Sequence, residues 1–263
     1  MINFRVVTGA VLALCFSLSA GSALAQTGTK PKFEPQSGQA GKDVVWVPTP
    51  QVLVDKMLSM AKVTPQDFVM DLGSGDGRTV ISAAKLGATA MGVEYNPDMV
   101  ELSKQNAEAA GVSGKATFVK ADLFETDLSR ATVITMFLLP QINVKLRPKI
   151  LDLKPGTRIV SNSFTMEDWE ADETATVTEN CTSWCTALLW IVPAKVEGTW
   201  TTSQGDLVLK QQYQMVSGTF GGKPISEGRL NGADLKFSVG GTEYTGKVSG
   251  NSIQGSRWTA TKK

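Results

Sequence analysis

The sequence predicts an α/β domain, built on a parallel β-sheet with helices on both faces, followed by a small all-β C-terminal domain. Two observations predict the first domain. Apolar runs of strand length alternate with segments of helical periodicity from residue 68 to 163, and a glycine-rich turn follows the first run. One observation predicts the second domain: after about residue 196 helical patterns vanish, and glycine recurs among short alternating runs.

The first predicted element is a helix that runs to about Ala61. Thr49 is a suitable N-cap for it, and Pro50 suits the first helical position. Strands and helices then alternate, and parallel crossovers place such helices on both faces of a sheet. The strands are expected at residues 68–72, 90–95, 116–120, 133–139 and 158–163, and the helices at 78–85, 97–110 and about 142–153.

A hairpin is predicted at the end of this domain, with strands at 174–179 and 186–192 and with Cys181 and Cys185 flanking its tip. Two thiols cannot complete a four-cysteine zinc site, and their spacing is not that of a Cys-x-x-Cys redox pair. The favoured interpretation is a structural disulfide, formed in an oxidising compartment.

The N-terminus has the pattern of a signal peptide over residues 1–25. Arg5 is followed by an apolar stretch from 6 to about 18 and by the small-residue end Ala23-Leu24-Ala25. Cleavage after Ala25 would export the chain to the periplasm or the medium and leave no stable membrane span; the alternative is an uncleaved membrane anchor. Residues 26–43 are predicted to be a flexible leader, 44–194 the α/β domain and 195–263 the β domain.

Composition excludes several classes of function. Histidine is absent, which removes Ser-His-Asp and Cys-His nucleophiles and histidine metal sites, and no metal site is predicted. The 26 Lys and Arg residues balance 25 Asp and Glu residues and form no runs, so no nucleic-acid partner is predicted.

The sharpest motif lies at residues 69–78, where Asp71 ends a strand and Gly73, Gly75 and Gly77 alternate before a helix. Glycines permit a tight turn and let a ligand approach backbone amides. A nicotinamide dinucleotide fold would require glycine at position 78, where this chain has Arg78. The alternating spacing instead resembles the first motif of class I methyltransferases, which bind S-adenosylmethionine on a Rossmann-like sheet.

Two further positions suit the same cofactor. Glu94 ends the second strand and is expected to accept both ribose hydroxyls. After the third strand, Asp122 would accept the adenine amino group, while Leu123 would supply a backbone amide and an apolar wall. The predicted cofactor is therefore S-adenosyl-L-methionine.

The chain also resembles one particular family, the lysine methyltransferases of the mitochondrial ATP synthase c-subunit and adenine nucleotide translocase. The resemblance implies that Pro48 and Thr49 border the pocket and that Phe137 to Pro140 lie where the acceptor binds. It covers about residues 45–192 and rests on residues 47–50, 71–78, 92–97, 135–140, 145–149 and 153–161.

Methyl transfer requires that donor and acceptor be held close and that water be excluded. Trp46, Phe137, Leu138 and Leu139 are candidates for an apolar channel that favours a neutral lysine amine. No catalytic base is predicted. The resemblance implies N-methylation of a protein lysine. The chain lacks the Pro-Pro-aromatic segment of many amino methyltransferases, which leaves the substrate class open, with a small molecule as the other acceptor. The alternative is an exported nucleotide-binding or scaffold protein, with a non-catalytic methyltransferase-like domain and a β recognition module.

Overall fold

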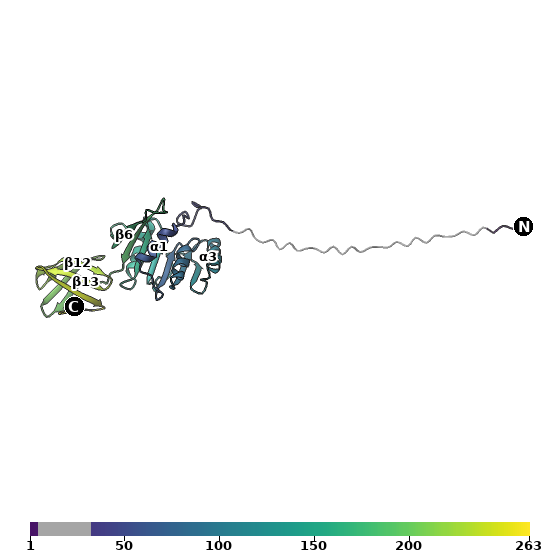
Figure 1. Cartoon of the computed structure of the whole chain (residues 1–263). Coiled ribbons are helices and arrows are strands. Elements are labelled where there is room, and N and C mark those ends of the chain that lie inside the picture. Colours follow the sequence, from purple (N-terminus) through teal and green to yellow (C-terminus); the bar gives the residue numbers. More distant parts are fainter. Residues whose placement is uncertain (5–32) are drawn as a thin grey trace. The chain divides into compact units, whose positions relative to one another are not determined.

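The computed structural model of the chain describes residues 1–4 and 33–263. Most of the predicted signal peptide and the first part of the predicted leader lie outside the described residues. Within the described part, no helix is both long enough and apolar enough to cross a membrane. Figure 1 shows the α/β domain in blue to teal and the C-terminal β domain in green to yellow.

The α/β domain is built on a seven-stranded sheet with the order β3-β2-β1-β4-β5-β7-β6. Strands β1 to β5 are parallel, β7 runs antiparallel to β5, and β6 pairs antiparallel with β7. The mixed α/β sheet that the sequence predicts is thus present. Its strands are β1 (Phe68–Leu72), β2 (Thr89–Glu94), β3 (Ala116–Lys120), β4 (Val133–Met136), β5 (Arg158–Asn162), β6 (Glu173–Thr176) and β7 (Thr186–Ile191).

Helices cover both faces of this sheet, because strands that are buried on both sides carry apolar residues in near-continuous runs. The helices are α1 (Gln51–Met60), α2 (Arg78–Lys85), α3 (Pro97–Ala109) and α4 (Pro140–Leu151). On one face, α1, α2 and α3 share a core with residues such as Val69 and Val133. On the other face, α4 packs its apolar residues with Met70 and Ile134.

The hairpin at the end of the domain consists of β6 and β7. Cys181 and Cys185 are joined by a disulfide at its tip, in agreement with the sequence. The bond closes a short loop between two strands that are already paired, so it fixes the tip more than it stabilises the fold.

Two local predictions near the sheet edge are wrong. Helix α1 begins at Gln51, with Pro50 at the N-cap and no side-chain cap, because the Thr49 hydroxyl instead accepts a hydrogen bond from the Asn162 amide at 3.3 Å. Strand β4 ends at Met136, three residues earlier than predicted, and α4 begins at Pro140. The chain thus leaves the sheet at residue 137, and the side chains of Phe137 and Leu138 line a cavity instead of continuing the strand.

Part of the predicted flexible leader, residues 38–43, belongs to a hydrogen-bonded loop. The amide of Gly38 donates to the carbonyl of Trp46 at 2.8 Å, and the amide of Trp46 donates to the carbonyl of Gln39 at 2.9 Å. These bonds close residues 38–46 into a loop, here called the strap. Composition alone missed it, because its contacts are made by backbone groups and by one lysine.

The C-terminal domain is a closed antiparallel barrel. Eight strands form the ring β10-β12-β13-β14-β15-β16-β8-β9, which the pairing of β9 with β10 closes, and β11 extends β10. Closure removes exposed sheet edges. The strands are β8 (Gly198–Thr202), β9 (Gly205–Gln212), β10 (Met215–Phe220), β11 (Lys223–Pro224), β12 (Ser226–Asn231), β13 (Asp234–Val239), β14 (Thr242–Ser249), β15 (Ser252–Gly255) and β16 (Thr259–Lys262).

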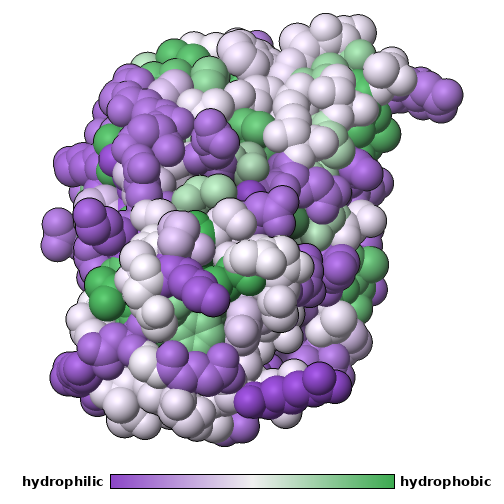
Figure 2. Space-filling view, turned by 90° about the vertical axis from the view of Figure 1, so that its left-hand side faces the viewer, coloured by the Kyte–Doolittle hydropathy of each residue, from purple (hydrophilic) through white to green (hydrophobic). Residues whose placement is uncertain are grey.

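The barrel encloses its own apolar core, which includes Trp200, Phe237 and Trp258. Figure 2 views the molecule from the side that carries the barrel in Figure 1, and on this face apolar groups are scattered among hydrophilic ones. That distribution suits a surface exposed to water.

The barrel and the α/β domain belong to one unit of the chain, which begins at Phe33. The ring of Tyr213 stacks on that of Trp169 at 5.7 Å between centroids, and its hydroxyl donates to Asp168 at 2.8 Å. Arg229 of β12 also pairs with Asp172 at 2.6 Å. These contacts lie after β5, away from the carboxyl ends of β1 to β3.

Candidate functional site

A cavity lies at the carboxyl edge of the parallel strands. In open α/β sheets this edge is where ligands bind, because the loops after the strands converge there. The strap, the loops after β1 to β4 and the start of α2 contribute its walls. It is lined by Asp71, Gly73, Gly75, Glu94, Asp122, Leu123, Pro48, Thr49 and Phe137 among the predicted site residues.

The glycine loop after β1 is held in a left-handed conformation, with φ of +78° at Gly73 and +54° at Gly75. A Cβ at Gly75 would lie 2.4 Å from Nε1 of Trp46, so only glycine allows the strap to approach the loop. Two residues of α3 fix the loop from behind. The Ser103 hydroxyl donates to the carbonyl of Gly75 at 2.7 Å, and the Asn106 amide donates to the carbonyl of Asp76 at 2.9 Å.

Gly77 is not among the residues that line the cavity, and its contact with the cofactor stays a prediction. It is the N-cap of α2, with φ of +82°. A Cβ there would lie 2.8 Å from the ring of Phe118 and 2.9 Å from Ser103. The third glycine of the motif therefore lets α2 pack closely against β3 and α3, which sets the position of the loop.

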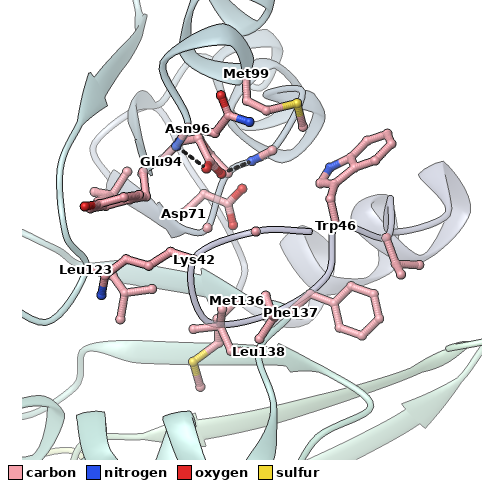
Figure 3. A pocket seen from close by; sticks show the side chains of 18 of the residues that line it. Lys42, Trp46, Asp71, Glu94, Asn96, Met99, Leu123, Met136, Phe137 and Leu138 are labelled. Carbon is pink, nitrogen blue, oxygen red and sulfur yellow. Dashed lines mark hydrogen bonds between the residues drawn. The ribbon is translucent and has the colours of Figure 1, made fainter. Parts of the chain in front are cut away.

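Glu94 extends from the end of β2 toward the glycine loop (Figure 3). One carboxylate oxygen accepts from the amide of Gly75 at 3.0 Å, and the other accepts from the amide of Asn96 at 2.8 Å. These two bonds fix the orientation of the carboxylate. Each oxygen keeps a further lone pair, which suits the recognition of two neighbouring hydroxyl groups.

Asp71 is buried beneath the glycine loop, and its carboxylate accepts from the Thr135 hydroxyl at 2.7 Å. Burial raises its pKa to about 7, and the negative charges of Asp76 and Glu94 act in the same direction. Arg78 pairs with Asp76 at 2.6 Å and donates to the carbonyl of Thr49 at 2.9 Å, which joins the loop to the start of α1.

Asp122 lines the cavity from the loop that follows β3. One of its oxygens accepts from the amide of Phe124 at 2.9 Å, and the other accepts from the ammonium of Lys42 at 2.9 Å. The hydrogen bond from Lys42 lowers the pKa of Asp122, and the ammonium also lies 5.3 Å from the centre of the Tyr95 ring. Lys42 thus ties the strap to the rim of the cavity, a contact that no motif predicted.

The other end of the cavity is apolar. Phe137 and Leu138 line it together with Pro48 and Thr49, and Figure 3 shows the two former residues on the side opposite Glu94, Asn96 and Met99. Pro140 is not among the lining residues, and its place beside the acceptor stays a prediction. It forms the first turn of α4, where its fixed φ and missing N–H are favourable.

The cavity therefore combines backbone amides on a glycine turn, two carboxylates spaced along the sheet edge and an apolar end. The hydroxyl of buried Ser74 has no partner within the described chain, which leaves one more polar group at the loop for a ligand. Such an arrangement fits an adenine nucleoside whose substituent extends toward Phe137. A Rossmann-like sheet with such a cavity at its carboxyl edge indicates an enzyme that uses a nucleoside cofactor.

Comparison with known proteins narrows this class. The family model described as the ANTKMT methyltransferase domain matches residues 71–173. A protein-lysine N-methyltransferase of Saccharolobus islandicus is 48% identical over 133 residues, which are 49% of this chain and 83% of that protein. The ATP synthase c-subunit lysine N-methyltransferase of Mus musculus is 36% identical over 130 residues, which are 49% of this chain and about half, 52%, of that protein.

Among solved structures, an RNA methyltransferase from Salinibacter ruber in complex with S-adenosyl-L-homocysteine aligns with a TM-score of 0.54 and 44% sequence identity. The alignment covers 57% of this chain and 96% of that one. The chain belongs to the protein-lysine N-methyltransferase family, and it is an S-adenosylmethionine-dependent methyltransferase.

Proposed function

We propose that this chain transfers a methyl group from S-adenosylmethionine to the side-chain amine of lysine in a protein outside the cytoplasm. The observation that carries the proposal is the division of one cavity into a carboxylate-lined end and an apolar end. The relative from Saccharolobus islandicus, named for protein lysine, supports the choice of acceptor.

The described side chains would hold the cofactor at the polar end. Glu94 would accept the two ribose hydroxyls, Asp122 the adenine amino group, and Leu123 would flank the base. The amides of the glycine loop, from Gly73 to Gly75, would face the remaining polar groups. When bound, S-adenosylmethionine supplies an electrophilic methyl group.

At the apolar end the chain would exclude water and favour a neutral amine. A lysine ammonium that enters an apolar environment loses hydration, and its pKa falls. Phe137 and Leu138 provide that environment, and Trp46 of the strap, which approaches Gly75, adds another apolar side chain to the lining of the cavity. The enzyme then needs chiefly to hold donor and acceptor close, because the methyl transfer is a displacement in line with the leaving sulfur.

Two observations support the proposed place of action: the signal pattern at residues 1–25, and the Cys181–Cys185 bond, since disulfides persist mainly in oxidising compartments. Both observations support export to the periplasm or the medium. Export also requires that S-adenosylmethionine reach that compartment. Fractionation of cells that express the chain tests this part directly, since a processed chain in the periplasmic fraction is expected and an unprocessed cytoplasmic chain would contradict it.

The activity is tested by incubating the whole chain with S-adenosylmethionine carrying an isotopically labelled methyl group and with an envelope protein fraction. Acid hydrolysis followed by amino-acid analysis is expected to place the label in methylated lysine. An RNA sample is incubated in parallel, in view of the Salinibacter ruber structure. Label in RNA, in small molecules or in another amino acid would overturn the lysine assignment, and no label with any acceptor would favour the non-catalytic alternative.

A further inference from the structure

Three aromatic rings form a continuous cluster beside the apolar end of the cavity. Phe137 follows β4, Phe164 follows β5, and Trp184 lies in the loop before β7. The centroids of Phe137 and Phe164 are 5.8 Å apart, those of Phe164 and Trp184 are 5.1 Å apart, and those of Phe137 and Trp184 are 5.8 Å apart. Residues from three separate segments thus meet in one place.

The sheet topology explains why they meet. Because β7 runs antiparallel to β5, the start of β7 lies at the same edge as the end of β5, and the amide of Ser163 donates to the carbonyl of Thr186 at 2.7 Å. The hairpin tip therefore reaches the edge where β4 also ends. Only Phe137 of the three rings lines the cavity, so the cluster leads from the cavity outward.

Trp184 differs from the other tryptophans of the described residues because 44% of its surface is exposed, whereas the others are partly or fully buried. Its backbone has φ of +56°, a left-handed conformation that is rare for a bulky residue. The Cys181–Cys185 bond closes the loop around it. The loop thus holds a large apolar ring that packs on Phe164 and Phe137 and stays partly exposed to water.

We propose that the cluster of Phe137, Phe164 and Trp184 is the binding wall for the acceptor lysine, an inference that rests on the proposed function. A lysine side chain has a flexible four-carbon stem and a compact ammonium. Tryptophan is the ring that attracts such a cation most strongly, and methylene groups pack along apolar rings. Trp184 attracts the incoming ammonium, Phe164 contacts the stem, and the amine reaches the cavity beside Phe137.

This assignment makes Trp184 a positioning and specificity residue that lies outside the cofactor site. It also gives the disulfide a role, because opening the loop releases the ring from the other two. A Cys181→Ser, Cys185→Ser double variant is expected to weaken acceptor binding less than Trp184→Ala does, since the side chain itself remains.

The kinetic test uses the whole chain, S-adenosylmethionine and the peptide acetyl-Gly-Lys-Gly-amide. Trp184→Ala is expected to raise the KM for the peptide about tenfold while kcat stays within about twofold, because the apolar contact of this ring with the bound lysine stem, made equally before and during reaction, is lost. Trp184→Phe should restore most of the loss. Leu86→Ala removes a similarly exposed apolar side chain at the end of α2 and serves as the matched control. An unchanged KM in Trp184→Ala would overturn the assignment of the aromatic cluster as the binding wall for the acceptor.

A binding test distinguishes the proposed role of the aromatic cluster in acceptor binding from the proposed methyl transfer. The chain is labelled with 5-fluorotryptophan, and the Trp184 signal is assigned by its absence in Trp184→Phe. The lysine peptide should shift this signal more than peptides with norleucine or glycine at the same position. A shift without methyl transfer to lysine would retain the wall and reject the proposed function. Methylated lysine with an unmoved signal, or equal shifts with all three peptides, would reject the wall and retain the function.

Discussion

The two ends of the cavity are formed by chemically different groups. The polar end depends on charged groups held by backbone amides: Glu94 is fixed by two N–H groups, and Asp122 by one N–H group and Lys42. The apolar end depends on rings and on one short stretch of chain, Phe137 and Leu138, which leaves the sheet after β4. The polar end is thus built to recognise one molecule by hydrogen bonds, whereas the apolar end recognises shape and the absence of water.

Because of this difference, the two ends of the cavity should respond differently to substitution. Hydrogen bonds to charged groups are directional and cost a large fraction of binding when lost. Apolar walls are tolerant, because another apolar side chain fills part of the same space. Substitutions at the polar end should therefore change the affinity for cofactor, and those at the apolar end should change the affinity for acceptor.

The largest expected effect concerns the free energy of unfolding. Asp71 has a folded-state pKa of about 7 against an ordinary value of 3.8. Ionisation therefore destabilises the fold increasingly as pH rises from about 4 to 7, by about 4 kcal/mol at most above that range. Asp71→Asn, which keeps an acceptor for Thr135, should gain about 2 to 3 kcal/mol over wild type between pH 5 and pH 8. Denaturant unfolding at both pH values measures this gain.

The matched variant is Thr135→Val, which removes the hydrogen bond that stabilises the ionised form of Asp71. It should lose more stability at pH 8 than at pH 5, the opposite trend to Asp71→Asn. Equal differences from wild type at both pH values, in both variants, would show that Asp71 does not titrate in this range.

The next effect concerns cofactor affinity. Glu94→Ala removes two charge-assisted hydrogen bonds to the ribose hydroxyls and should raise the Kd for S-adenosylhomocysteine about 100-fold. Glu94→Gln keeps one acceptor oxygen and should lie between Ala and wild type. Equilibrium dialysis gives both constants, and wild-type affinity in Glu94→Ala would remove the ribose assignment.

Phe137→Ala tests the opposite end. It should raise the KM for the lysine peptide about tenfold, through lost apolar contact, while the Kd for S-adenosylhomocysteine stays within about twofold. Phe137→Leu keeps most of the apolar surface and should recover most of the loss. If cofactor affinity falls as far as acceptor affinity, the two ends are not separate.

The smallest effect concerns the strap. Lys42→Met removes its bond to Asp122, so the strap opens more readily and S-adenosylhomocysteine should dissociate about two- to fivefold faster. Added salt should shrink the difference, because it screens the wild-type pair. The control is Lys195→Met, which breaks an exposed salt bridge with Asp152 that does not involve residues of the cavity. Stopped-flow measurement would contradict the role of Lys42 if both variants matched wild type at low salt.

Much of the polar end could be predicted from the sequence, because its residues stand at strand ends with motif spacing. Asp71, Gly73, Gly75, Glu94 and Asp122 all line the cavity. At Gly77 the packing of α2 requires a glycine, and the motif alone does not show whether a ligand or a helix sets such a requirement. The order of the helices and strands was also predictable, because hydrophobic periodicity reports burial directly.

The rest depends on long-range contacts that no local pattern encodes. The strap has a polar composition that resembles a linker, and it is held by backbone hydrogen bonds, by the Lys42–Asp122 pair and by the approach of Trp46 to Gly75. The aromatic cluster requires the pairing of β5 with β7 to bring Phe164 and Trp184 together. The eight-stranded closure of the barrel likewise depends on the β9–β10 pairing, whereas its short strands were visible in the sequence.

The most direct test of the account is calorimetric titration of the folded chain with S-adenosylmethionine and with S-adenosylhomocysteine. Both compounds are expected to bind at one site with micromolar Kd, and the heat of binding is expected to disappear in Glu94→Ala. A folded chain that takes up neither compound would contradict the assignment of the cavity at the sheet edge.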